Sequence, residues 1–129
     1  MADWDDVRRL ALALPETNER ESGGNLQWRV KDNLFVWERP LRQADLQALG
    51  AQAPKGPVLG VRVEDLGEKE ALLAEDPRVF FTTPHFNGYA AVLVQLERIS
   101  VAQLTPVIAE AWLARAPARL AREYQGRVP

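Results

Sequence analysis

The stretch FFTTPHFNGYAAVLVQL, residues 80–96, contains the only histidine of the chain, His85. A histidine titrates near neutral pH, so His85 is a candidate for a general base or a ligand contact. A nucleophilic or metal-assisted mechanism would need partners. The sequence has no cysteine, no GxSxG motif, no second histidine and no HExxH-like pattern. We therefore predict no catalytic residues, no metal site and no cofactor, and His85 is either a binding residue or a polar residue of a turn.

The Asn87-Gly88 pair favours a two-residue hairpin turn within this stretch. In the register that such a turn imposes, Phe86 faces Tyr89 and one side of the hairpin is apolar. The apolar side, expected in the core, carries Val79, Phe81, Val92, Val94 and Leu96. The other side carries Phe80, Thr82, Phe86, Tyr89, Leu93 and Gln95.

A second hairpin is predicted over residues 25–39, where apolar and polar residues alternate. Asp32-Asn33 is the expected turn, since both residue types tolerate positive φ. This register places Trp28 opposite Trp37. A further strand is expected at 58–65, with Leu59, Val61 and Val63 on one side.

Helices are predicted at residues 3–14 and 66–75, capped by Asp3 and Asp65. The segment 99–124 is also predicted to be helical and is divided by Pro117; Ser100 and Thr105-Pro106 are alternative starts. Residues 43–49 suit one helical turn, and residues 15–24 are expected to form a polar connection.

The resulting order is helix, three strands, helix, two strands, helix, joined by short loops that favour antiparallel pairing. We predict one α+β domain over residues 1–129, a two-layer fold with an antiparallel sheet of about five strands and the helices packed on one face. The length of 129 residues, with 47% hydrophobic and 26% charged residues, fits one domain. No apolar run reaches the ~20 residues of a membrane span. Without cysteines or a signal peptide, the protein is expected to be cytoplasmic.

The second face of this sheet is expected to interleave cations with aromatic side chains, which suits phosphates with stacked bases or a protein partner. A net charge of -2 argues against a strongly basic nucleic-acid-binding protein. Arg115, Arg119 and Arg122 form a second candidate basic patch. The face is predicted to carry Gln27, Arg29, Lys31, Val36, Glu38, Arg62, Phe80, Phe86, Tyr89 and Leu93.

Three segments, ALALPETNERESGGNLQWRVKDNLFVW, LLAEDPRVFFTTPHFNGYAAVLVQLERIS and AWLARAPARLA, resemble the MmcQ/YjbR family of small bacterial proteins. The LPE after the first helix and the TPHFNGY stretch are the more specific parts. The resemblance implies a CyaY-like or secretion-chaperone-like fold. It also implies DNA binding through two wings, which would be the hairpins around Asp32-Asn33 and Asn87-Gly88.

These observations lead to a non-enzymatic binding domain. In the first hypothesis it binds DNA, with Arg29, Lys31 and Arg62 on phosphates and with Phe86 and Tyr89 stacking. In the alternative, the same aromatic and basic face, together with His85, binds a small ligand or a protein, with the chain a monomer or a weak homodimer. An enzyme with His85 as its base is the third hypothesis.

Overall fold

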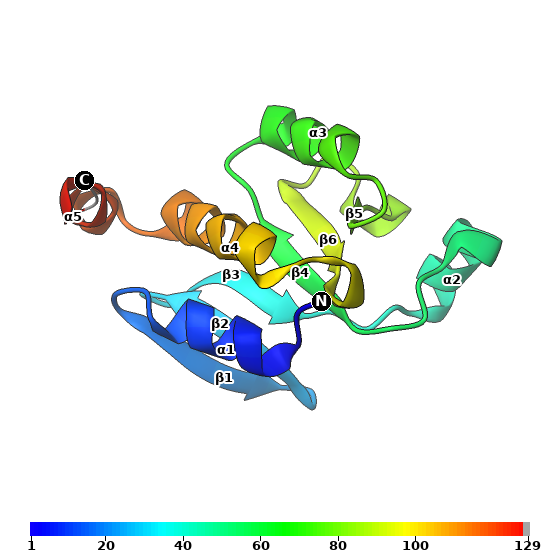
Figure 1. Cartoon of the computed structure of the whole chain (residues 1–129), viewed down its shortest axis with the longest axis horizontal. Helices are drawn as coiled ribbons and strands as arrows, with labels where there is room; N and C mark the ends of the chain where they lie inside the picture. The colour runs from blue at the N-terminus through cyan, green and yellow to red at the C-terminus, as the bar shows by residue number, and fades with distance from the viewer. Residues whose placement is uncertain (128–129) are drawn as a thin grey trace.

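A six-stranded antiparallel sheet forms one layer of the structure, with strand order β1-β2-β3-β4-β6-β5 (Figure 1). The computed structural model describes residues 1–127. The strands are β1 (Thr17–Ser22), β2 (Asn25–Val30), β3 (Asn33–Glu38), β4 (Val58–Arg62), β5 (Phe80–Phe81) and β6 (Ala91–Gln95). The predicted α+β fold is confirmed, with one strand more than expected.

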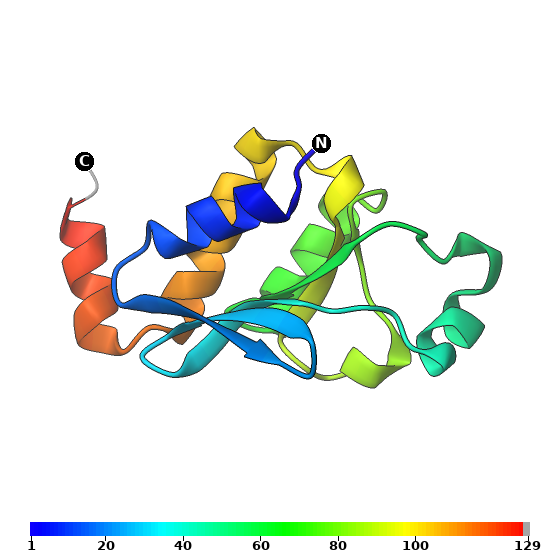
Figure 2. The same ribbon diagram turned by 90° about the horizontal axis from the view of Figure 1, so that it is seen from below.

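The helices α1 (Trp4–Leu12), α3 (Leu66–Glu75) and α4 (Val101–Arg115) cover one face of the sheet (Figure 2). The other face, called the open face below, carries no long helix (Figure 2). Two helices lie at the sides: α2 (Gln43–Leu49) after β3, and α5 (Ala118–Arg127) after Pro117. Short 3-10 turns are η1 (Gly50–Gln52), η2 (Pro84–Phe86) and η3 (Leu96–Arg98). Among the described residues, no helix has the length and apolar character to cross a membrane.

The helix starts follow from their capping residues. Asp3 and Asp6 exchange backbone-to-carboxylate hydrogen bonds of 2.9 and 3.0 Å, a capping box for α1. Asp65 and Ser100 each accept a hydrogen bond from the backbone N–H three residues later. Helix α4 therefore starts after Ser100, the first of the two predicted starts, and Pro106 lies inside it.

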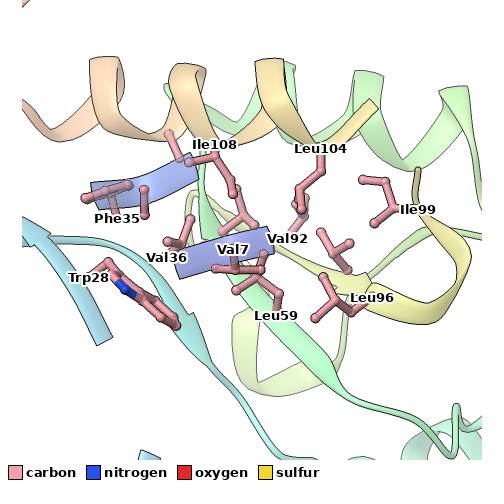
Figure 3. Packing of buried hydrophobic residues seen from close by; sticks show 14 of the residues in the cluster. Val7, Trp28, Phe35, Val36, Leu59, Val92, Leu96, Ile99, Leu104 and Ile108 are labelled. Carbon is pink, nitrogen blue, oxygen red and sulfur yellow. The ribbon is translucent and has the colours of Figure 1, made fainter. Parts of the chain in front are cut away.

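The main core lies between the sheet and the helices (Figure 3). Leu59 and Val92 of the sheet pack under Leu104 and Ile108 of α4, and Trp28 is fully buried at its side. Burying one such side chain contributes roughly 1.5–3 kcal/mol, so this layer supplies most of the driving force for folding. The indole N–H of Trp28 donates to Glu19 at 3.0 Å, which satisfies its polar atom.

Residues 15–24 do not form the predicted connection, because residues 17–22 are the edge strand β1, paired with β2. The sequence TNERES is polar on both sides, so it lacks the alternation by which a strand is recognised. Charged side chains suit a sheet edge, since they discourage pairing with another chain. Gly23 and Gly24, with φ of +58° and +85°, form the turn into β2.

The register predicted for the β2–β3 hairpin is wrong, because the turn lies one residue earlier than expected. The pairing differs from the prediction by two residues next to the turn and by one residue beyond the irregularity described next. Lys31 and Asp32 are the turn residues, with φ of +48° and +68°, and Val30 pairs with Asn33. A β-bulge follows, because Arg29 pairs with Leu34 but Trp28 pairs with Val36. Trp28 and Trp37 are therefore not opposite each other.

The bulge also changes which face each residue of β3 occupies. Phe35 and Val36 are both buried in the core, so Val36 does not belong to the open face as predicted. Glu38, two residues after Val36, lies on the same face as Val36, the face that the helices cover, and not on the open face as predicted. It accepts a hydrogen bond from the backbone N–H of Leu26. Trp37 lies on the open face instead.

The predicted hairpin at Asn87-Gly88 is wrong as well. Asn87 (φ −60°, ψ 129°) and Gly88 (φ +74°) form a type II turn inside a loop of residues 82–90, not a two-residue hairpin turn. Strand β5 is only two residues long, and Phe80 pairs with Val94. Phe80 is therefore in the core and Phe81 on the open face, the reverse of the prediction.

Candidate functional site

The loop of residues 82–90 lies on the open face of the sheet (Figure 2). Its residues 85–89 border a groove. The groove has a volume of about 480 Å³ and is called the β3–loop groove here. Within residues 1–127, no carboxylate lines it. Its lining residues are Leu34, Trp37, Arg39, Arg42, His85, Phe86, Asn87, Gly88 and Tyr89.

The position of Trp37 depends on a glycine in the neighbouring strand. Trp37 pairs with Gly60 of β4, and its indole lies directly against that residue. A Cβ atom at position 60 would lie 2.5 Å from Cζ2 and 2.8 Å from Cδ2 of Trp37. Only glycine therefore allows the indole to lie flat on the sheet as one wall of the groove.

Phe86 forms the floor of the groove and is itself almost fully buried. It packs on a small second core made with Val58, Ala91 and Leu93. Its ring centroid lies 6.4 Å from that of Trp37 and 6.2 Å from that of Tyr89. Phe86 thus positions the two more accessible rings and offers little surface to a ligand.

A buried ion pair supports the groove from below. The Arg39 guanidinium lies 5.2 Å from the ring centroid of Phe86 and donates to Asp45 of α2 at 3.0 Å. Burial by itself would raise the pKa of Asp45, but the backbone N–H of Arg42 and the charge of Arg39 outweigh it, so the pKa is lowered. The charge of Arg39 is thereby neutralised within the protein.

Lys69 of α3 fixes the type II turn of the loop. This side chain is buried, and its Nζ donates to the carbonyl oxygens of Phe86 at 2.6 Å and Tyr89 at 2.9 Å. Among the described residues no carboxylate pairs with it, and burial lowers the pKa of Lys69. One ammonium group thus holds both ends of the turn.

Arg62 of β4 holds Tyr89 in the same way from the sheet. Its guanidinium carbon lies 4.5 Å from the ring centroid of Tyr89. It donates to the hydroxyl of Tyr89 at 2.8 Å and to the carbonyl of Ala90 at 3.1 Å. Burial lowers the pKa of Arg62, and the nearby charge of Arg115 acts in the same direction. Tyr89 remains 43% exposed, in a fixed orientation.

Four of the residues predicted from the sequence come together in this region: Arg62, His85, Phe86 and Tyr89. His85 is exposed and its ring meets that of Phe86 edge-on at 4.9 Å. Of the cations predicted to bind phosphate, Arg62 contacts Tyr89 of the groove, whereas Arg29 and Lys31 are not among its lining residues.

The remaining predicted cations are not among the lining residues of the groove. Arg29 donates to Gln27 and to the carbonyl of Asp32. Lys31 lies in the turn beside α5, 3.7 Å from Glu16. Arg115 donates to the carbonyl of Leu34, and Arg119 pairs with Glu123 at 3.4 Å.

Sequence reasoning missed four residues that build the site. Trp37 was placed opposite Trp28, which is buried in the core, because the bulge was not foreseen. Arg39 and Arg42 stand in a segment punctuated by prolines and glycines, and Lys69 stands in a helix rich in charged residues. Nothing in these local patterns distinguishes them from solvated side chains. The run LFVW, in which alternation breaks down, was the one available indication of an irregular strand.

The chain is similar to a known protein family and to a solved structure. The model of the YjbR family matches residues 12–114. The chain is 50% identical over 127 residues to Uncharacterized protein Rv2570 of Mycobacterium tuberculosis and to Uncharacterized protein Mb2600 of Mycobacterium bovis, with 96% of each chain covered. The crystal structure of Deinococcus radiodurans protein DR2400, with the family-model domain DUF419, is similar with a TM-score of 0.69 and 18% identity. It covers 98% of this chain and 89% of that chain, and at this identity it supports the fold alone.

Proposed function

The chain belongs to the YjbR family, and we propose that it is a non-enzymatic binding domain whose β3–loop groove takes a small ligand with a planar ring joined to an anionic group. The composition of the groove carries this proposal. Trp37 and Tyr89 supply aromatic surface, and Arg42 and His85 supply exposed polar groups at the rim. No carboxylate of the described part of the chain lines the groove. The volume of about 480 Å³ lies in the range of small-molecule sites.

The planar part of the ligand is inferred from the aromatic walls. Stacking of a ring on an aromatic side chain contributes about 1–3 kcal/mol. Tyr89 is already oriented by Arg62, and the loop that carries it is held by Lys69. Such preorganisation lowers the entropy cost of binding, because little remains to be ordered when the ligand arrives.

The anionic part is inferred from the charges that remain available. Arg39 is neutralised by Asp45, and Arg62 is engaged with Tyr89. Arg42 is exposed at the rim of the groove, as is His85. A charge-assisted hydrogen bond from Arg42 to a phosphate or carboxylate would contribute about 1.5–3 kcal/mol.

A binding role fits His85 better than a catalytic one. A general base is normally oriented by a hydrogen bond from a third group. Within residues 1–127, His85 contacts the ring of Phe86 but forms no hydrogen bond to another side chain. We therefore assign His85 to ligand contact.

DNA binding remains an alternative with less support. Duplex binding needs several cations spaced along a phosphate backbone. On the open face Arg29 and Arg62 are engaged in hydrogen bonds within the protein, and Lys31 lies away from them beside Glu16. A nucleotide-sized ligand therefore takes precedence over the duplex in this proposal.

The test is calorimetric titration of the chain with AMP as the probe, alongside adenosine, inorganic phosphate, single-stranded DNA and duplex DNA. We expect AMP to bind more tightly than adenosine or phosphate. Arg42→Gln and Tyr89→Ala should each weaken AMP binding by about tenfold. Arg78→Gln, an exposed arginine outside the groove, is the matched control and should have no effect.

The absence of AMP binding, or equal binding by all three variants, would refute the proposal. Duplex binding that falls steeply between about 50 and 200 mM salt, without AMP binding, would replace it with the DNA-binding role.

A further inference from the structure

A second groove lies on the helix face of the sheet, between α3 and α4. It has a volume of about 480 Å³ and is called the α3–α4 groove here. Among the residues that the structure describes, no lysine, arginine or histidine lines it. Its lining residues are Val63, Glu64, Glu68, Leu72, Glu75, Phe80, Gln103, Pro106, Val107 and Glu110.

The two helices present matching stripes to this groove. Glu68, Leu72 and Glu75 of α3 are spaced i, i+4, i+7, as are Gln103, Val107 and Glu110 of α4. This spacing places the members of each stripe on one side of their helix. Each stripe has an apolar residue between polar ones, and the buried Phe80 of β5 forms the floor. The groove is therefore an apolar strip bordered by carboxylates.

The carboxylates of the groove have no cationic partners within the described part of the chain. Glu64, Glu68, Glu75 and Glu110 are exposed, and none of them forms an ion pair there. Some carboxylates elsewhere are paired, as the half-buried Glu19 is with Arg8 at 2.7 Å. Four unpaired negative charges around one groove are unfavourable in the isolated protein. A cationic occupant would relieve this repulsion.

We infer that the α3–α4 groove docks a basic amphipathic helix of a partner protein. Apolar residues of that helix would sit on Leu72, Phe80 and Val107, and lysine or arginine residues would face the glutamates. A helix seated by its apolar face in a groove is a recurrent mode of recognition, and complementary charge raises the association rate. This groove and the β3–loop groove have no lining residue in common.

The probe for this inference is a synthetic amphipathic helical peptide of leucine and lysine, with a matched peptide carrying glutamate in place of lysine. Titration of the full chain, followed by 1H–15N NMR, should shift the amides of Leu72, Val107 and Glu110 with the lysine peptide only. Binding should weaken as salt rises.

Three sets of variants make this test specific. Glu68→Gln/Glu75→Gln/Glu110→Gln should weaken peptide binding by about tenfold or more. Glu21→Gln/Glu70→Gln, exposed carboxylates outside the groove with Glu70 on α3 itself, should leave it unchanged. Val107→Gln keeps the charge, removes an apolar contact and should also weaken binding.

Shifts elsewhere on the surface, or equal loss of binding in the control pair, would overturn the inference. Two other results would assign the groove to a different occupant. One is that butylamine shifts the same amides and binds with the same affinity as the peptide. The other is self-association of the chain that the triple glutamine variant abolishes.

Discussion

Replacing Gly60 by alanine should disturb the β3–loop groove through Trp37 alone. A Cβ at position 60 would lie 2.5 Å from Cζ2 of Trp37, whereas ordinary van der Waals contacts of a Cβ are 3.4–4 Å. The indole must therefore move by about 1 Å. Neighbouring Phe86 blocks free movement, because its ring centroid is 6.4 Å from that of Trp37. Overpacking of this kind costs about 1–3 kcal/mol.

Urea unfolding followed by circular dichroism measures this loss directly. The control is Gly67→Ala, the same chemical change in α3, where the new Cβ would meet only Asp65 Oδ1 at 3.3 Å. That variant should gain up to about 1 kcal/mol, since alanine favours helix over glycine. Gly60→Ala should also weaken AMP binding, because the displaced indole forms one wall of the groove.

A double-mutant cycle tests the assigned cause. In a Trp37→Leu background the clash is relieved, so Gly60→Ala should cost much less than in the wild-type protein. A loss below about 0.5 kcal/mol for the single variant, or the same loss in both backgrounds, would refute the reasoning about Trp37.

Three further predictions follow from the charges. Asp45→Asn leaves Arg39 buried without its partner and should cost about 3–5 kcal/mol in urea unfolding. Folding lowers the pKa of Asp45 from its ordinary 3.8, so the stabilisation by this carboxylate is present in the wild-type protein above pH 3.8. It is lost as the pH falls through the lowered pKa, and the Asp45→Asn variant should lack this part of the loss of stability in acid. Lys69→Met should lower the free energy of unfolding by only about 1–2 kcal/mol, because the carbonyls of Phe86 and Tyr89 each keep a backbone N–H partner. Amide hydrogen exchange in the loop of residues 82–90 should accelerate, and unchanged exchange would contradict the role assigned to Lys69. Glu75→Gln/Glu110→Gln should raise the free energy of unfolding by about 0.5–1 kcal/mol at low salt and by less at high salt. A lower free energy of unfolding would show that these carboxylates do not repel one another.

The fold could be predicted from the sequence where local patterns and tertiary packing agree. Asp3, Asp65 and Ser100 cap helices as their residue types indicate, and Leu59 and Val61 alternate into the core as expected. Strand β1 escaped prediction because an edge strand with two solvated sides has no hydrophobic period.

The candidate site was harder to predict, because it depends on two backbone irregularities. The bulge at Phe35 moves Trp37 to the open face, and the type II turn at Asn87-Gly88 makes a loop where a hairpin was expected. Asn-Gly suits both turns, so the choice between them depends on contacts distant in sequence. Lys69 of helix α3 provides these contacts by donating hydrogen bonds to the carbonyl oxygens at both ends of the turn.

The most direct test of the binding role is an NMR map of the chain with saturating AMP. We expect shifts for the Trp37 indole N–H, for the His85 ring and for the amides around Tyr89, with the α3–α4 groove unaffected. Shifts confined to Lys31, Arg119 and the surface near α5, or no shifts at all, would contradict the assignment of the β3–loop groove as the ligand site.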